Sequence, residues 1–145
     1  MTDAPKFNII EFLPYLLNQA AEQTSLGFQE KYRQRYGMLR TEWRVLFHLG
    51  KYSNLTANDI VIKAKIHKTK VSRAVQALSE KGYVEREEDQ ADRRREHLLL
   101  TKQGLSVYQD LSREAATYER KLVEGLSADE VTTLKKLLSR FAGSI

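Results

Sequence analysis

Hydrophobic positions recur every three to four residues through the first third of the chain and predict two helices. The first helix covers Asn8 to about Gly37, with an early interruption at Pro14, because proline is tolerated only in the first turn of a helix. A short turn should therefore precede the main part of this helix. The second helix is predicted from Leu39 to about Lys51. Its expected buried face carries Trp43, Leu46, Phe47 and Gly50.

Two shorter helices and a hairpin are predicted in the middle of the chain. After a turn over residues 53–55, Thr56 and Asp59 have the spacing of a capping box, which indicates a helix ending near Ala64. The next helix is predicted over His67–Lys81, and Gly82 ends it. Beyond this glycine the hydrophobic period changes to two. Strands are therefore expected over 83–87 and 97–100, joined by a charged loop.

Two amphipathic helices close the chain. One is predicted from Thr101 to about Gly125, and a capping box formed by Ser127 and Glu130 starts the last. The expected fold is mainly α with a small β-hairpin, a winged helix-turn-helix over residues 39–100. The length of 145 residues fits a single domain over 1–145, in which the helices of 7–37 and 101–145 flank the winged helix.

Composition narrows the chemistry that this chain can perform. It has no cysteine, so disulfides, thiolate zinc sites and thiol redox switches are excluded. Its three histidines fall on different predicted elements, so no metal and no cofactor is expected. The sequence carries no glycine-rich phosphate loop and no nucleophile elbow, which argues against an enzyme. With neither a signal peptide nor an apolar run of membrane-spanning length, the protein is expected in the cytoplasm, without a membrane partner.

Positive charge is concentrated at the start of the predicted helix 67–81. The net charge is +5, and residues 63–73 hold five of the cations and no acid. The inward positions of this helix leave a polar face: Lys68, Thr69, Lys70, Ser72, Arg73 and Gln76. Lysine and hydroxyl side chains reach phosphates, and arginine and glutamine can bond base edges in a major groove. A solvated basic helix face explains this segment equally well.

The tip of the predicted hairpin favours nucleic acid. Arg93, Arg94 and Arg95 are adjacent there, and three neighbouring cations gain little from folding. A narrow minor groove offers them concentrated negative potential. We expect Asp92 to pair with one arginine and brace the loop. A basic helix followed by a basic hairpin tip predicts binding to double-stranded DNA. The alternative is a winged helix that contacts an acidic protein partner without specific DNA readout.

These segments resemble the MarR family of winged-helix transcriptional regulators. Residues 89–95 match its D-x-x-D-R-R pattern, and residues 98–104 match the L-T-x-x-G pattern that follows. Residues 71–84 and 42–46 are also typical of the family. The resemblance implies a sequence-specific DNA-binding repressor. The sequence departs from the family pattern at His67, because the family usually has a Ser or Thr at this position as the cap of the helix. Either Thr69 satisfies the first helical turn, which we favour, or His67 turns toward DNA.

The resemblance also implies a homodimer, joined by the terminal helices, on a palindromic operator. The sequence supports this, because those helices carry more apolar surface than a lone winged helix can bury. The expected interface comprises Phe7, Ile9, Ile10, Phe12, Leu122, Leu126, Leu134, Leu138 and Phe141.

Many members of the family respond to small aromatic acids or phenols, so the resemblance also implies an aromatic effector. Its expected pocket lies between the dimerisation helices and the winged helix. The candidate lining residues are Tyr15, Tyr36, Arg40, Trp43 and Phe47. An aromatic stripe at helical spacing is, however, more typical of a core than of a pocket.

Overall fold

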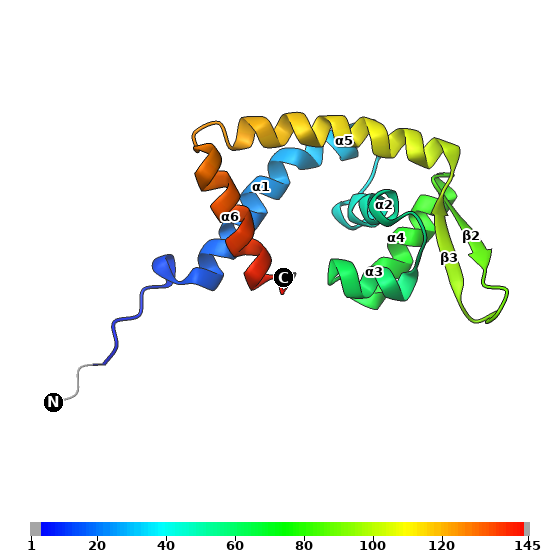
Figure 1. Ribbon diagram of the computed structural model, residues 1–145, viewed down its shortest axis with the longest axis horizontal. Coiled ribbons are helices and arrows are strands. Elements are labelled where there is room, and N and C mark those ends of the chain that lie inside the picture. The colour runs from blue at the N-terminus through cyan, green and yellow to red at the C-terminus, as the bar shows by residue number, and fades with distance from the viewer. Residues whose placement is uncertain (1–3, 144–145) are drawn as a thin grey trace. The chain divides into compact units, whose positions relative to one another are not determined.

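The computed structural model describes residues 4–143, and its helices are drawn in Figure 1. The chain divides into two units, residues 1–112 and 113–145, which are described separately below. The elements are η1 (Ile9–Glu11), α1 (Leu13–Tyr36), α2 (Arg40–Tyr52), β1 (Leu55–Thr56), α3 (Ala57–Ala64), α4 (Lys68–Glu80), β2 (Val84–Glu88), β3 (Glu96–Leu100), α5 (Lys102–Leu122) and α6 (Ala128–Phe141). Within the described residues, no helix is both long enough and apolar enough to span a membrane. The predicted fold class, mainly helical with a small hairpin, is confirmed.

The interruption predicted at Pro14 is confirmed, and it separates η1 from α1. The side chain of Asn8 caps η1 by accepting a hydrogen bond from the backbone N–H of Ile10 at 3.1 Å. Pro14 then lies in the first turn of α1, where its missing N–H leaves no intrahelical bond unmade. The helix ends at Gly37, whose φ of +62° is a left-handed conformation that glycine adopts without steric cost.

The helix-turn-helix is built by α2, α3 and α4. The capping box predicted for α3 is present in both halves: Thr56 Oγ1 accepts from Asp59 N–H, and Asp59 Oδ2 accepts from Thr56 N–H. The side chains of α4 that face the other helices are Val71, Ala74, Val75 and Leu78. They are the apolar positions from which this helix was predicted, so its orientation follows from its pattern.

Two details of this region differ from the sequence expectation. Leu55 was expected in a turn, yet together with Thr56, the predicted cap of α3, it forms β1, which pairs with β3 and completes a three-stranded antiparallel sheet in the order β1-β3-β2. The buried face of α2 is also rotated: Glu42, Val45, Leu46 and Leu49 are buried, whereas Trp43 and Phe47 are partly exposed. The reason is that α2 packs on two sides, against α4 and against an aromatic cluster.

That aromatic cluster joins three helices of the first unit. Trp43 lies edge-on to Phe28 and Phe47, with ring centroids 5.4 and 5.1 Å apart, and Phe47 lies edge-on to Tyr108 at 5.1 Å. Tyr32 packs beside Trp43 and is fully buried. Aromatic pairs in this arrangement contribute about 0.5–1.5 kcal/mol each beyond their buried area. The cluster therefore fixes α1 and α5 against α2.

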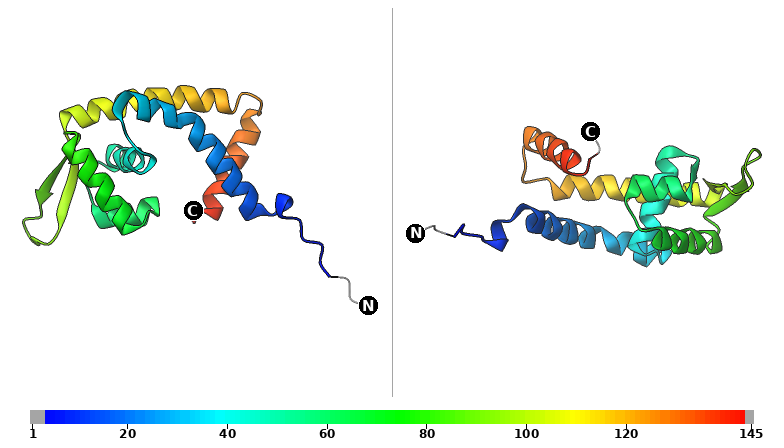
Figure 2. Two further views of the ribbon diagram at one scale, coloured as in Figure 1. Left: turned by 180° about the vertical axis from the view of Figure 1, so that it is seen from behind. Right: turned by 90° about the horizontal axis from the view of Figure 1, so that it is seen from below.

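The sheet carries a hairpin that projects from the helices at one edge (Figure 1 and Figure 2). We call this hairpin, β2 and β3 with their connecting loop 89–95, the wing. Because β3 is the central strand, its partners lie on both edges: His97, for example, is opposite Thr56 of β1 and Glu87 of β2. The wing is thus held to the helix-turn-helix by main-chain hydrogen bonds through β1.

The second unit contains the end of α5 and the helix α6. A capping box starts α6: Ser127 Oγ accepts from Glu130 N–H, and Glu130 Oε1 accepts from Ser127 N–H at 2.9 Å. Lys135 pairs with Glu119 at 3.1 Å. No described residue of α6 is buried, and its apolar side chains border an open groove of about 440 Å³.

Gly104, the glycine of the L-T-x-x-G pattern, is required by a close backbone approach. A Cβ atom at this position would lie 2.0 Å from the carbonyl oxygen of Tyr83. We expect Gly104→Ala to lower the free energy of unfolding by about 1–3 kcal/mol, because main chain cannot move aside as a flexible side chain can. Urea denaturation measures this.

The control is Gly125→Ala, where an added Cβ would meet no atom within 4 Å. This variant should unfold at nearly the same urea concentration as the parent protein. Equal midpoints for Gly104→Ala and the parent would contradict the steric explanation.

Candidate nucleic-acid interface

The polar face predicted for α4 lies open to solvent. Lys68, Thr69, Lys70, Ser72, Arg73 and Gln76 are all exposed. The first turn of α4 contains no acid, so its basic side chains add to the positive end of the helix dipole. This end of α4 is therefore an electropositive surface suited to phosphate.

His67 caps α4 in an arrangement that neither sequence alternative described. Its Nδ1 accepts a hydrogen bond from the backbone N–H of Thr69 at 3.2 Å. The imidazole thus does what a Ser or Thr oxygen does at an N-cap, and the Thr69 amide is the group that it satisfies. Histidine replaces the usual cap here without leaving the first turn unpaired.

Gln76 is exposed, but its amide is engaged within the chain. Gln76 Oε1 accepts from Arg86 at 3.0 Å, and Gln76 Nε2 donates to Glu80 at 3.0 Å. Arg86 also pairs with Glu96 at 3.4 Å, so this group links α4 to both long strands of the wing. Base contact by Gln76 would require these bonds to break, whereas Arg73 makes no such bond to another described residue.

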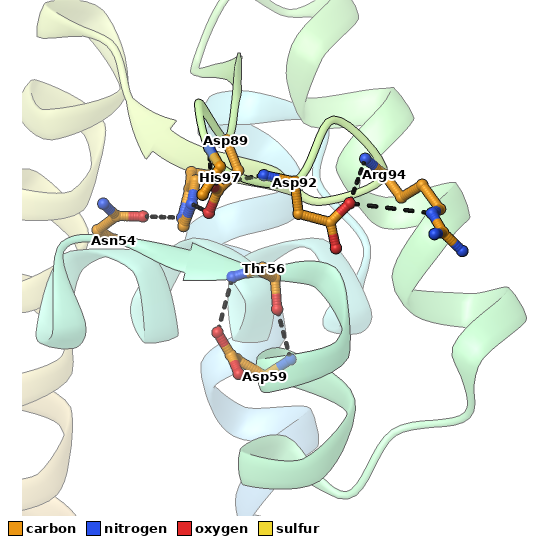
Figure 3. A network of polar contacts seen from close by, with 8 residues as sticks. Asn54, Thr56, Asp59, Asp89, Asp92, Arg94 and His97 are labelled. Atoms are coloured by element: carbon orange, nitrogen blue, oxygen red, sulfur yellow. Dashed lines mark hydrogen bonds and ion pairs between the residues drawn. The ribbon is translucent and has the colours of Figure 1, made fainter.

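The carboxylates of Asp89 and Asp92 stabilise the loop at the tip of the wing (Figure 3). Asp89 Oδ1 accepts from the backbone N–H groups of Ala91 and Asp92, at 2.8 and 3.2 Å. Asp92 Oδ1 in turn accepts from the backbone N–H of Arg94 at 3.1 Å and lies 3.9 Å from Arg94 Nε. The Arg94 side chain is 95% exposed. The acids therefore face the loop's own backbone and leave Arg94 pointing outward.

The second oxygen of Asp89 faces His97, a contact that sequence reasoning missed. His97 Nε2 donates to Asp89 Oδ2 at 2.8 Å, and His97 Nδ1 lies 2.9 Å from Asn54 Oδ1. The His97 hydrogen bond and, after it, the two loop amides lower the pKa of Asp89 to about 2. His97 lies only two residues beyond the arginine run, but the partnership with Asn54 spans 43 positions of sequence. No local pattern could have indicated it.

Cations of α4 and the wing line one open cleft of about 530 Å³. Lys68 contributes from the start of α4, and the run Arg93–Arg95 contributes from the loop. Asp59 borders the same cleft, and its pKa is lowered chiefly by the hydrogen bond from Thr56 N–H and further by the charge of Arg95. The structure thus brings the two predicted basic segments together on one surface, where an anion can meet both.

The residues predicted for an effector pocket have separate partners. Trp43 and Phe47 belong to the aromatic cluster of the core. Tyr36 donates to Asp110, and burial, followed by that hydrogen bond, raises the Tyr36 pKa to about 12. Arg40 pairs with Glu22 at 3.0 Å, and Tyr15 is half-buried on α1. Of these five residues, Trp43 and Phe47 lie edge-on to each other, with ring centroids 5.1 Å apart. Over the described residues, no three His, Asp or Glu side chains gather as metal ligands would.

Comparison with known proteins agrees with this geometry. A model of the MarR family matches residues 36–95. The chain is 29% identical over 113 residues to the HTH-type transcriptional regulator PapX of Escherichia coli, covering 74% of this chain and 69% of PapX. A MarR/EmrR family regulator from Acinetobacter sp. ADP1 superposes with a TM-score of 0.85 at 29% identity, covering 95% and 97% of the two chains. Bordetella bronchiseptica BpsR, solved for the regulation of its DNA binding by 6-hydroxynicotinic acid, gives 0.86 at 20% identity, with coverage of 95% and 98%.

The sheet, the exposed face of α4 and the arginine-tipped loop define a winged helix-turn-helix of the DNA-binding class. Family model, curated relatives and solved structures point to the same group. Residues 36–95 match the MarR family model, and along most of its length the chain is similar to transcriptional regulators of the MarR type. The role of these relatives is not enzymatic.

The Asp89 pKa predicts how the wing responds to acid. Because folding lowers this pKa from 3.8 to about 2, the carboxylate stabilises the folded loop above the ordinary value, and this stabilisation is lost as pH falls toward 2. We expect the ¹³C shift of the Asp89 carboxyl to titrate with a midpoint near 2. The same titration in the His97→Ala variant should have a higher midpoint. A midpoint near 4 in the parent protein would contradict the hydrogen bonds described for this loop.

Proposed function

We propose that the protein acts in the cytoplasm as a dimeric repressor that binds a palindromic operator in double-stranded DNA. The single observation that carries this proposal is the shared cleft. Lys68 of α4 and the arginines of the loop, which are 25 residues or more apart in sequence, line the same open surface. Neutralising phosphates with several such cations releases counterions and supplies much of the binding free energy.

The two basic elements have different roles in this proposal. Helix α4 enters the major groove, where Arg73 reads base edges while Lys68, Thr69, Lys70 and Ser72 contact phosphates or base edges. Gln76 reads a base only if its bonds to Arg86 and Glu80 are released. Arg93, Arg94 and Arg95 lie along the adjacent minor groove, with Asp92 bracing the loop.

The dimer is proposed from apolar side chains that the single chain leaves exposed. In the first unit these lie before and at the start of α1, and in the second they lie on the end of α5, the turn after it and α6. Their exposed fractions run from 41% to 69%, for Phe7, Ile9, Ile10, Phe12, Leu122, Leu126, Leu134, Leu138 and Phe141. Apolar surface on this scale is typical of an interface. A two-fold dimer would hold its two α4 helices on half-sites roughly 34–36 Å apart.

A small aromatic acid is proposed as the effector that releases DNA. BpsR, whose DNA binding is regulated by 6-hydroxynicotinic acid, supports this by its similar fold. The candidate residues remain Tyr15, Tyr36, Arg40, Trp43 and Phe47. Because Trp43 and Phe47 pack against other rings, a ligand there must displace an aromatic contact. Repeating the binding assays below with aromatic acids present measures any release.

Selection of bound fragments from a random duplex pool tests the proposal as a whole. We expect an enriched sequence with two inverted half-sites whose centres are about one helical turn apart. Sedimentation of the protein with the selected duplex should give two chains per site. Equal retention of all duplexes at moderate salt would favour the alternative, a winged helix that contacts an acidic protein.

Two arginine variants test the separate roles of α4 and the wing. Arg73→Ala should weaken binding to the selected duplex by roughly 1–3 kcal/mol and relax base preference within the half-site, because a bidentate base contact is lost. Arg94→Ala should weaken binding to all sequences more evenly and reduce its salt dependence. Fluorescence anisotropy over a salt series measures both.

Arg33→Ala, on α1 and away from the cleft, is the matched control for removing one positive charge. It should bind as the parent protein does. If Arg73→Ala and Arg94→Ala were also indistinguishable from the parent, the roles assigned to α4 and the wing would be wrong.

A further inference from the structure

An unbroken series of polar contacts connects the helix-turn-helix to the tip of the wing (Figure 3). It begins at Asn54, just before β1, and passes through His97 on β3 to Asp89 at the start of the loop. From Asp89 it continues to the amides of Ala91 and Asp92, and from the Asp92 carboxylate to the amide of Arg94. Every contact in the series measures between 2.8 and 3.2 Å.

His97 is the most firmly placed member of this series. Its backbone is paired on both edges, opposite Thr56 and opposite Glu87. Its ring is half-buried, with 26% of the side chain exposed, and it has only two rotatable side-chain bonds. Asp89, by contrast, lies at the start of the loop, where its backbone N–H donates to the carbonyl of Arg95 at 3.0 Å and its side chain is held by the contacts of the series. The ring therefore offers a fixed donor to the second oxygen of a carboxylate whose first oxygen accepts from the loop amides.

We infer that His97 is a positioning residue for DNA binding, which holds Asp89 and through it sets the place of Arg94. This inference rests on the proposed function of the wing. The histidine itself need not touch DNA, because its ring nitrogens face Asp89 and Asn54. Its contribution is to order the loop before DNA arrives, so that less conformational entropy is lost on binding.

Removing the ring should loosen the loop and weaken binding. In His97→Ala, Asp89 Oδ2 loses its donor, and the turn that Asp89 stabilises through Ala91 and Asp92 has one anchor fewer. Ordering a few side chains on binding carries a penalty that corresponds to a decrease of about three- to tenfold in affinity. Asn54→Ala, which removes the other contact of the ring without changing charge, should act in the same direction and less strongly.

The first arm of the test uses the DNA-free protein. Heteronuclear ¹⁵N NOE values should fall for residues 90–95 in His97→Ala and stay unchanged in the helices. Gln90→Ala is the matched control, because it alters an exposed side chain of the same loop and leaves the series of contacts intact. An equal melting temperature for parent and variants shows that the fold is retained. Unchanged loop values in His97→Ala would overturn the inference.

The second arm is a double-mutant cycle on the selected duplex. If His97 acts by placing Arg94, the His97→Ala/Arg94→Ala double variant should bind about as weakly as Arg94→Ala alone. When His97→Ala is combined with Arg73→Ala, the two decreases in affinity should multiply, because Arg73 lies on α4 and its place does not depend on the loop. A merely structural role for His97 would give full multiplication in both cycles, and this outcome would overturn the inference.

The two arms separate this inference from the proposed function. If Arg94→Ala binds as tightly as the parent, the wing has no role on DNA, and the proposed function of the wing fails together with the inference. If Arg94→Ala binds weakly while His97→Ala keeps full affinity, the proposed function stands and only the inference is wrong.

Discussion

The pairing of β3 on both edges is the constraint on which the position of the wing depends. Through β1 the strand is tied to the start of α3, and through β2 it carries the wing. Because successive side chains of a strand point to opposite faces, Leu98 enters the core while its neighbour His97 points the other way, toward Asn54 and Asp89. The strand β3 thereby contributes Leu98 to the core and His97 to the contacts that stabilise the loop. The register of β3 thus places the wing beside the helix-turn-helix.

Polar contacts adapt this common framework to the particular residues of the chain. His67 caps α4 through an imidazole nitrogen, and Gln76 joins α4 to the wing through Arg86. The first contact satisfies the first turn of α4 itself, the second joins α4 to β2, and neither involves the apolar core. The orientation of α4 is therefore supported by its buried stripe and by the Gln76–Arg86 contact with the wing.

The sequence was informative wherever structure is local. The helical period predicted which residues of α4 face outward, both capping boxes were found from four-residue patterns, and the break at Pro14 followed from the geometry of proline. Where position depends on distant partners, the sequence was less informative. A two-residue strand such as β1 has no period of its own, and it exists because β3 provides its hydrogen bonds. The buried face of α2 was misjudged because that helix packs on two sides.

The candidate site shows the same division. The cations could be predicted because they cluster in sequence, and the exposure of Arg94 agrees with that expectation of an accessible basic tip. The polar contacts that restrain this site could not be predicted, because they join different elements. Gln76 bonds to Arg86 of β2, and Asn54 contacts His97 through the sheet. Whether a polar side chain is available to a ligand depends on partners that only the folded chain brings near.

The charge balance of the wing also affects how the protein would approach a duplex. Residues 88–96 contain four acids and only three arginines, so the segment as a whole is slightly negative. Its positive character exists only at short range, where Asp89 and Asp92 accept hydrogen bonds from the loop's own amides and the Arg94 side chain extends into solvent. Residues 63–73, which hold five cations and no acid, must then supply the long-range electrostatic steering. Diffusional capture would begin at α4, and the wing would engage only after the groove is within a few ångströms.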